Sequence, residues 1–189
     1  MRWCTLFLIC SCSLLVGHPR SLAAQNEGTL AAKGTLSDQL VGAWRLVSVE
    51  TVRPNGDVIY PYYGKHPVGL LVYDSSGWMS VQMVSDPQPA LPLSDSREGF
   101  LAAPEAQRIA AVNGYYAYFG TWSVDASGAT VTHHIQQSLY PGERNESVVR
   151  KVLFQGGRLT LLATAHEMNE DHQRRLIWER IAPSSKSAP

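Results

Sequence analysis

The 189-residue chain carries no net charge and, beyond its first twelve residues, no cysteine. Its 16 lysines and arginines balance 16 aspartates and glutamates. Because the sequence has no run of lysines and arginines, it shows no basic patch that would bind a nucleic acid or an anionic membrane surface. Cys4, Cys10 and Cys12 are the three cysteines, so a disulfide framework and a thiolate metal site are excluded from the rest of the chain.

Long apolar stretches are missing too, except near the N-terminus. After Arg2, residues 3–16 are mostly apolar, and they are followed by Pro19 and the small-residue site Ser21-Leu22-Ala23. This order is typical of a secretory signal peptide. We therefore expect residues 1–23 to be removed and the mature protein to be secreted or periplasmic. No later segment reaches the roughly 20 apolar residues that a membrane span requires.

Removal of this segment alters both the charge and the cysteine count. It takes away Arg2 and Arg20 but no acidic residue, which leaves a formal charge of −2. All three cysteines leave as well, so the mature domain must be stable through its core alone. An alternative is a lipoprotein that is acylated at Cys12. Beyond the signal peptide we expect a flexible leader over 24–36, one domain over 37–182 and a disordered tail over 183–189.

From residue 42 onward, short β-rich runs alternate with turn sequences, which predicts an all-β protein. Eight of these runs are long enough to be strands: 42–53, 68–73, 77–84, 115–124, 129–139, 147–155, 158–164 and 174–181. Residues 57–60 form a shorter extended flap after the first strand. An even number of antiparallel strands allows the last strand to pair with the first and close the sheet. The sequence thus predicts an eight-stranded antiparallel up-and-down barrel.

The connections between the strands are mostly turns. Residues 85–99 contain three prolines and are interpreted as a loop, whereas 104–113 begins with Pro104 and stops before Gly114, which predicts a short helix before the fourth strand. His166 and His172 fall in the connection before the last strand, and we interpret them as solvated polar residues.

Several motifs resemble the lipocalin-like domain family, which is related to the lipocalins and the fatty-acid-binding proteins. They run in order over residues 37–181 and are Gly-Ala-Trp-Arg-Leu-Val-Ser at 42–48, Gly-Leu-Leu-Val-Tyr at 69–73, Gly-Trp-Met-Ser at 77–80, Tyr-Phe-Gly-Thr-Trp-Ser-Val-Asp at 118–125, Val-Thr-His-His at 131–134, Ser-Leu-Tyr-Pro at 138–141 and Trp-Glu-Arg at 178–180. The resemblance implies a calycin-type barrel whose end is closed by Gly42, Trp44 and Arg180. The strand order agrees, because it places Arg180 beside Trp44, where a guanidinium can stack on an indole.

Candidate binding residues gather where the topology places the open end of the barrel. Alternation in the fourth strand puts Tyr116 and Tyr118 on one face, which we take as inward, and Gln82 lies near the end of the third strand. Arg150 shares a face with apolar neighbours, so if that face is inward its guanidinium needs an anion. The alternatives are that the tyrosines are ordinary rim residues and that Arg150 points outward beside an acid such as Glu146.

His133 is expected to point inward, because it alternates with Val131 and Ile135. It is interpreted as a satisfied interior histidine, a ligand contact, a general base or a heme ligand. His134 must point to the opposite face, so the pair does not chelate one metal ion. We expect no metal site and no resident cofactor.

Two functions fit these residues. The first is an exported protein, a monomer or weak homodimer, that binds a small hydrophobic molecule with a polar or anionic group through Tyr116, Tyr118, His133, Arg150 and Gln82. The alternative is a cofactor-independent isomerase or cyclase that acts on a small metabolite in the same cavity, with His133 or a tyrosine as its acid–base group.

The signal-peptide hypothesis predicts the N-terminus of the exported protein. Expression of the full chain in a host with a secretory pathway should yield a mature form that begins at residue 24 or 25, as read by intact mass and N-terminal sequencing. A mature form that begins at Cys12 and carries lipid would establish the lipoprotein alternative instead.

Overall fold

The structure is a computed structural model that describes residues 34–88, 96–167 and 169–182. The expected signal peptide, residues 24–33 of the leader and the expected tail lie outside these ranges. Within them, no helix has both the length and the apolar character needed to cross a membrane.

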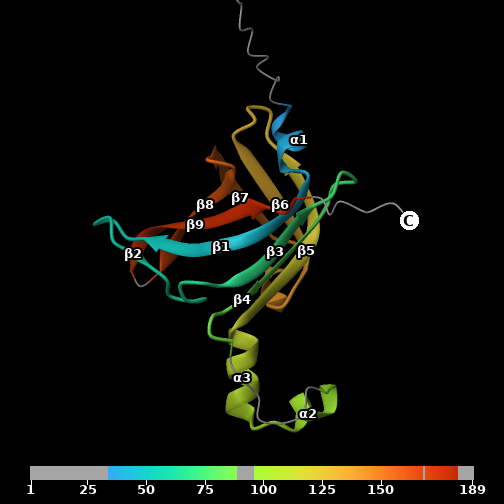
Figure 1. Ribbon diagram of the computed structural model, residues 1–189, viewed down its shortest axis with the longest axis vertical. Coiled ribbons are helices and arrows are strands. Elements are labelled where there is room, and N and C mark those ends of the chain that lie inside the picture. The colour runs from blue at the N-terminus through green and yellow to red at the C-terminus, as the bar shows by residue number, and fades with distance from the viewer. Residues whose placement is uncertain (1–33, 89–95, 168, 183–189) are drawn as a thin grey trace, which may run out of the picture. The chain divides into compact units, whose positions relative to one another are not determined.

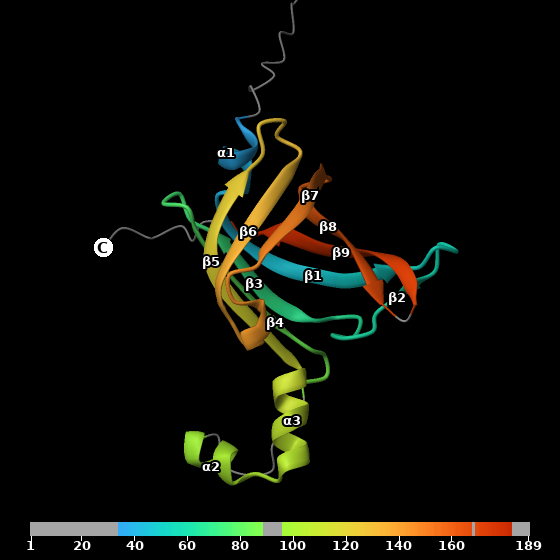
Figure 2. The same ribbon diagram turned by 180° about the vertical axis from the view of Figure 1, so that it is seen from behind.

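Eight antiparallel strands form a closed barrel, which confirms the predicted fold. Their bounds are β1 (Gly42–Val52), β3 (Val68–Tyr73), β4 (Trp78–Val84), β5 (Tyr115–Val124), β6 (Thr130–Ser138), β7 (Ser147–Gln155), β8 (Arg158–Glu167) and β9 (Glu170–Arg180). Neighbours in the chain pair in order, and β9 returns to pair with β1 from Trp44↔Arg180 to Val52↔Gln173. Figures 1 and 2 show β9 beside β1 from both sides. The expected flap is β2 (Val58–Ile59), a two-residue strand on the end of β1.

Among the described residues, three short α-helices accompany the barrel. α3 (Glu105–Asn113) is the predicted helix, with Pro104 as its N-cap residue. α2 (Arg97–Ala102) lies where a loop was expected: the side chain of Ser96 accepts a hydrogen bond from the Gly99 amide and so caps a turn too short to show apolar periodicity. α1 (Leu36–Leu40) precedes β1 and begins with a capping box between Thr35 and Asp38.

The hairpin of β8 and β9 extends further than the sequence predicted, and it corrects the interpretation of His172. The two strands pair as far as Glu167↔Glu170, so the expected connection is mostly strand. His172 is only 1% exposed, because it shares the inward face of β9 with Leu176 and Trp178. His166 is exposed and pairs with Asp171 at 2.8 Å, as a solvated histidine can.

One end of the barrel is filled by large apolar side chains. Leu40 of α1, Trp44 of β1 and Trp178 of β9 are all at most 2% exposed, and the indole Nε1 of Trp44 donates a 2.9 Å hydrogen bond to the Leu40 carbonyl. The register of β1 shifts between Leu46 and Ser48, so its buried positions change from even to odd numbers. The bulge thus keeps an apolar face inward along the whole strand.

Arg180 covers this filled end from outside. Its guanidinium carbon lies 4.1 Å from the centroid of the Trp44 ring, and its two terminal nitrogens donate to the carbonyls of Val41 and Gln39 at the end of α1. Gly42 leaves room for this contact: a Cβ there would lie 2.6 Å from Nη1, and φ is +132°, a conformation that side chains rarely adopt. Indole, guanidinium and glycine therefore form one packed unit.

The unit predicts a coupled loss of stability. Arg180→Gln removes the cation–π contact and two hydrogen bonds, so the free energy of unfolding in urea should fall by about 1–3 kcal/mol. Gly42→Ala displaces the same guanidinium and should cost less in the Arg180→Gln background than in the native protein. Arg158→Gln, at an exposed arginine, serves as the control. Strict additivity of the two substitutions would contradict the coupling.

Candidate functional site

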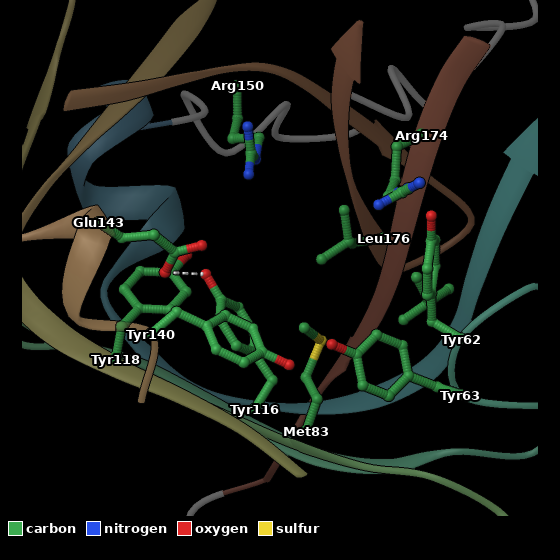
Figure 3. Close-up of a pocket in the computed structure, with 11 residues that line it drawn as sticks. Tyr62, Tyr63, Met83, Tyr116, Tyr118, Tyr140, Glu143, Arg150, Arg174 and Leu176 are labelled. Carbon is green, nitrogen blue, oxygen red and sulfur yellow. Dashed lines mark hydrogen bonds between the residues drawn. The ribbon is translucent and has the colours of Figure 1, made fainter. Parts of the chain in front are cut away.

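The open end of the barrel contains a cavity of about 350 Å³. It lies where β4 ends and β5 begins, opposite the end that α1 closes. Its lining residues are Val49, Tyr62, Tyr63, Met83, Tyr116, Tyr118, Tyr140, Glu143, Arg150, Arg174 and Leu176. Figure 3 shows the guanidinium groups of Arg150 and Arg174 across the cavity from Met83, Tyr116 and Tyr63. The volume equals that of on the order of ten waters, which suits a small organic molecule.

Tyrosine rings form one wall of the cavity. Tyr116 stacks on Tyr140, with centroids 5.4 Å apart and an interplanar angle of 27°, and lies 5.4 Å from the ring of Tyr118. The Tyr116 hydroxyl donates to Glu143 Oε2 at 2.8 Å, and Ser138 donates to the same oxygen at 2.6 Å. Burial and the bond to Glu143 raise the pKa of Tyr116 above its usual value. The wall therefore presents apolar ring faces and neutral hydroxyl groups.

His133 lies beneath this wall, as expected for an inward residue, and both of its ring nitrogens are engaged. Nε2 is 2.6 Å from the Tyr73 hydroxyl and Nδ1 is 2.7 Å from that of Tyr118. Burial, with a further contribution from the nearby cation of Arg150, lowers the pKa of His133 to about 3. The imidazole is neutral at physiological pH, and neither nitrogen is left for a heme iron or for a substrate proton. This geometry favours the interpretation as a satisfied interior histidine.

Arg150 projects into the cavity from β7 without an acidic partner among the described residues (Figure 3). Its one hydrogen bond there is a 3.5 Å contact from Nη1 to the Val149 carbonyl. Other arginines of the barrel differ: Arg175 pairs with Glu50 at 2.7 Å and Arg53 with Glu170 at 2.6 Å. A half-buried guanidinium without a carboxylate favours an anion as its partner.

Gln82 does not line this cavity. In β4 the side chains of Met79, Val81 and Met83 are buried, so Gln82 lies on the outer face, where it donates to Ser80 and lines a separate surface groove. The expectation that it shares the cavity is wrong. Position near the strand end suggested the mouth, but alternation with three apolar neighbours decides the face.

Tyr73, Arg174 and Glu143 are polar residues at the site that were not among the candidates chosen from the sequence. Tyr73 alternates inward with Leu71, a signal that the sequence contained. Arg174 alternates with Leu176 and His172 on β9, but the expected strand began only at this residue. Glu143 comes from η1 (Pro141–Glu143), a 3-10 turn between β6 and β7, and no periodic signal places a turn residue at the mouth.

Metal binding has no support in the described part of the chain. Over these ranges, no three His, Cys, Asp or Glu side chains come together in a group that could hold an ion. The site chemistry there consists of hydroxyl donors, one carboxylate and two guanidinium groups around an apolar floor.

The buried histidine predicts a dependence of stability on pH. Between pH 6.5 and 3 the unfolded chain protonates residue 133 while the folded protein does not, since the folded pKa is about 3. The free energy of unfolding should therefore fall as the pH drops through this window, by up to about 1.4 kcal/mol per pH unit. His133→Gln should flatten the slope between pH 6.5 and 5 in urea unfolding. His134→Gln, on the opposite face, should keep it, and the reverse pattern would contradict the assignment.

Comparison with known proteins identifies the family of the chain. Curated proteins yield no match to it. The family model described as a lipocalin-like domain matches residues 41–181, a range that contains every strand of the barrel. The resemblance found in the sequence motifs is thereby confirmed, and the chain belongs to the lipocalin-like domain family.

Proposed function

We propose that the protein binds a small, largely apolar molecule that carries an anionic group, with that group held by Arg150 inside the barrel. The observation that carries the proposal is a cavity-facing guanidinium with no carboxylate partner among the described residues. The remaining walls supply apolar surface through Val49, Met83 and Leu176 together with the tyrosine rings. A concave apolar site with a few placed polar groups is the usual form of a small-molecule pocket.

The charges around the cavity support an anion over a cation. Two guanidinium groups, those of Arg150 and Arg174, line the site against one carboxylate, that of Glu143. Glu143 already accepts hydrogen bonds from Tyr116 and Ser138, which reduces its attraction for a ligand cation. Arg174 also lies over the ring of Tyr62 at 4.8 Å and extends the cationic wall toward the mouth.

A carrier fits the site better than an enzyme that uses His133. A general base needs a free lone pair within reach of the substrate proton, and a pKa near the working pH. Both nitrogens of His133 are bonded to tyrosines, and its pKa is about 3. The isomerase or cyclase alternative therefore has no acid–base group at this residue.

The setting of this function follows from the N-terminal sequence. The signal-peptide pattern of residues 1–23 supports export, and so a ligand that is met in the periplasm or outside the cell. We expect the mature protein to work as a monomer or weak homodimer, because pairing of β1 with β9 joins the two ends of the barrel sheet, and the strand left at an edge among the described residues is the two-residue β2.

A charged and a neutral probe of the same size separate anion recognition from general hydrophobic binding. Fluorescence titration should show saturable binding of 2-naphthoate and of 2-naphthylmethanol. Arg150→Gln should weaken 2-naphthoate about tenfold or more, since a hydrogen bond to a charged group contributes about 1.5–3 kcal/mol. It should leave 2-naphthylmethanol within about twofold.

Lys151→Gln provides the matched control. It removes the same charge one residue along β7, at an exposed position on the outer face, and both probes should bind as they do to the native protein. Absence of saturable binding, or an Arg150→Gln variant that binds 2-naphthoate as tightly as the native protein does, would overturn the proposal.

A further inference from the structure

Three buried polar side chains from three strands form a chain of hydrogen bonds beneath the cavity. The Tyr73 hydroxyl of β3 meets His133 Nε2 at 2.6 Å, and the Tyr118 hydroxyl of β5 meets Nδ1 at 2.7 Å. Tyr73 is 0% exposed and His133 1%, whereas Tyr118 lines the cavity. Tyr73, at one end of these hydrogen bonds, is thus enclosed by protein, and Tyr118, at the other end, reaches the binding site.

The number of protons on these three side chains restricts which of them donates in each hydrogen bond. Burial lowers the pKa of His133 to about 3, so the ring is neutral and carries one N–H donor and one lone pair. Burial also raises the pKa values of Tyr73 and Tyr118, so both phenols keep their protons. One tyrosine must therefore donate to the ring while the other accepts from it.

Burial of Tyr73 decides which tyrosine donates. Among the described residues its hydroxyl has a single hydrogen-bond partner, His133 Nε2. If Nε2 carried the proton, the Tyr73 O–H would be buried without an acceptor, a costly state for a polar group. If Tyr73 donates to Nε2, the proton lies on Nδ1 and is donated to the Tyr118 oxygen. The Tyr118 O–H is then left over.

We propose that Tyr73 and His133 are positioning residues that turn the Tyr118 hydroxyl into a hydrogen-bond donor to the ligand. The site then selects molecules that present an acceptor there: a carboxylate, a phenolate or a carbonyl group, in preference to a group that only donates. This inference rests on the proposed function, because it assigns a second contact to the polar group that Arg150 binds.

Arg150 and Tyr118 are placed to share one acceptor. Arg150 pairs with Val131 across the β6–β7 ladder, and Val148 pairs with His133, so Arg150 and His133 lie on diagonal positions of one face. Arg150 and Tyr118 line the same cavity, and the positive charge of Arg150 lowers the pKa of Tyr118 against the larger effect of burial. The guanidinium of Arg150 and the hydroxyl of Tyr118 thus both bind the polar group at one end of the ligand.

The tautomer of His133 is a direct test that needs no ligand. Long-range ¹H–¹⁵N correlation spectra of the labelled protein at pH 7, assigned with His133→Gln, should show the proton on Nδ1 and a bare Nε2. In Tyr73→Phe the donor to Nε2 is lost, and the Nε2–H tautomer should appear. A native ring protonated on Nε2 would overturn the inference.

Neutral probes test the donor role of Tyr118 apart from the charge of Arg150. The native protein should prefer 2-acetylnaphthalene, which has a carbonyl acceptor, to 2-ethylnaphthalene, which has no polar group. Tyr118→Phe should reduce this preference about three- to tenfold, the range of one neutral hydrogen bond. Tyr73→Phe should reduce it as well, because Tyr118 can then donate to His133 instead.

Tyr115→Phe, which removes the hydroxyl of an exposed tyrosine three residues earlier in β5, is the matched control and should keep the preference. An unchanged preference in Tyr118→Phe or in Tyr73→Phe would refute the relay. The two proposals can fail separately. If 2-naphthoate binding depends on Arg150 but the preference for 2-acetylnaphthalene is unchanged in Tyr118→Phe and Tyr73→Phe, the proposed function stands and the relay is refuted. If no probe binds but the His133 proton lies on Nδ1, the proton arrangement stands and the proposed function is refuted.

Discussion

Pairing of β1 with β9 is the interaction on which the rest of the molecule depends. It joins the ends of the sheet over most of both strands and so creates an interior. A barrel of eight strands is just wide enough to be filled by side chains or to hold one small ligand. This chain does both at different ends: Leu40, Trp44 and Trp178 fill one end, and the other keeps a cavity of about 350 Å³.

Closure also makes a buried polar group without a partner costly. The chain of Tyr73, His133 and Tyr118 supplies such partners within the protein, at the cost of a histidine held neutral. Arg150 has only a 3.5 Å hydrogen bond to the Val149 carbonyl and no acidic partner within the described residues, although Arg175 and Arg53 pair with acids. The contrast between satisfied and unsatisfied groups is what points to an anion. It also points away from catalysis by His133, because a base needs a lone pair that is free.

Much of this architecture could be predicted from the sequence, since alternation and turn residues are local signals. The even number of β-rich runs predicted that the sheet closes, and the alternation of apolar residues around His133 predicted that its side chain points inward. The predictions that failed concerned segments with a weak local signal. α2 is stabilised by one cap at Ser96 and has too few residues for a pattern. The connection near His172 reads as a polar loop because few of its residues are apolar, yet it pairs as strand almost to its end.

The binding site was predicted less completely than the barrel, for a physical reason. A cavity combines side chains from strands distant in sequence with residues of turns, and turns have no periodicity to read. Glu143 is such a turn residue, because it belongs to η1. Gln82 failed for the opposite reason: its place along β4 was right, but its face was decided by Val81 and Met83, whose burial turns it outward. Position along a strand and direction of the side chain are separate predictions.

The most direct measurement is a crystal structure of the protein in complex with 2-naphthoate. The carboxylate should lie at roughly hydrogen-bond distance, about 3 Å, from the guanidinium of Arg150 and from the Tyr118 hydroxyl, with the rings against the tyrosine wall. A naphthoate bound outside the barrel, or a cavity filled by side chains with Arg150 turned to an acidic residue, would contradict the proposed site.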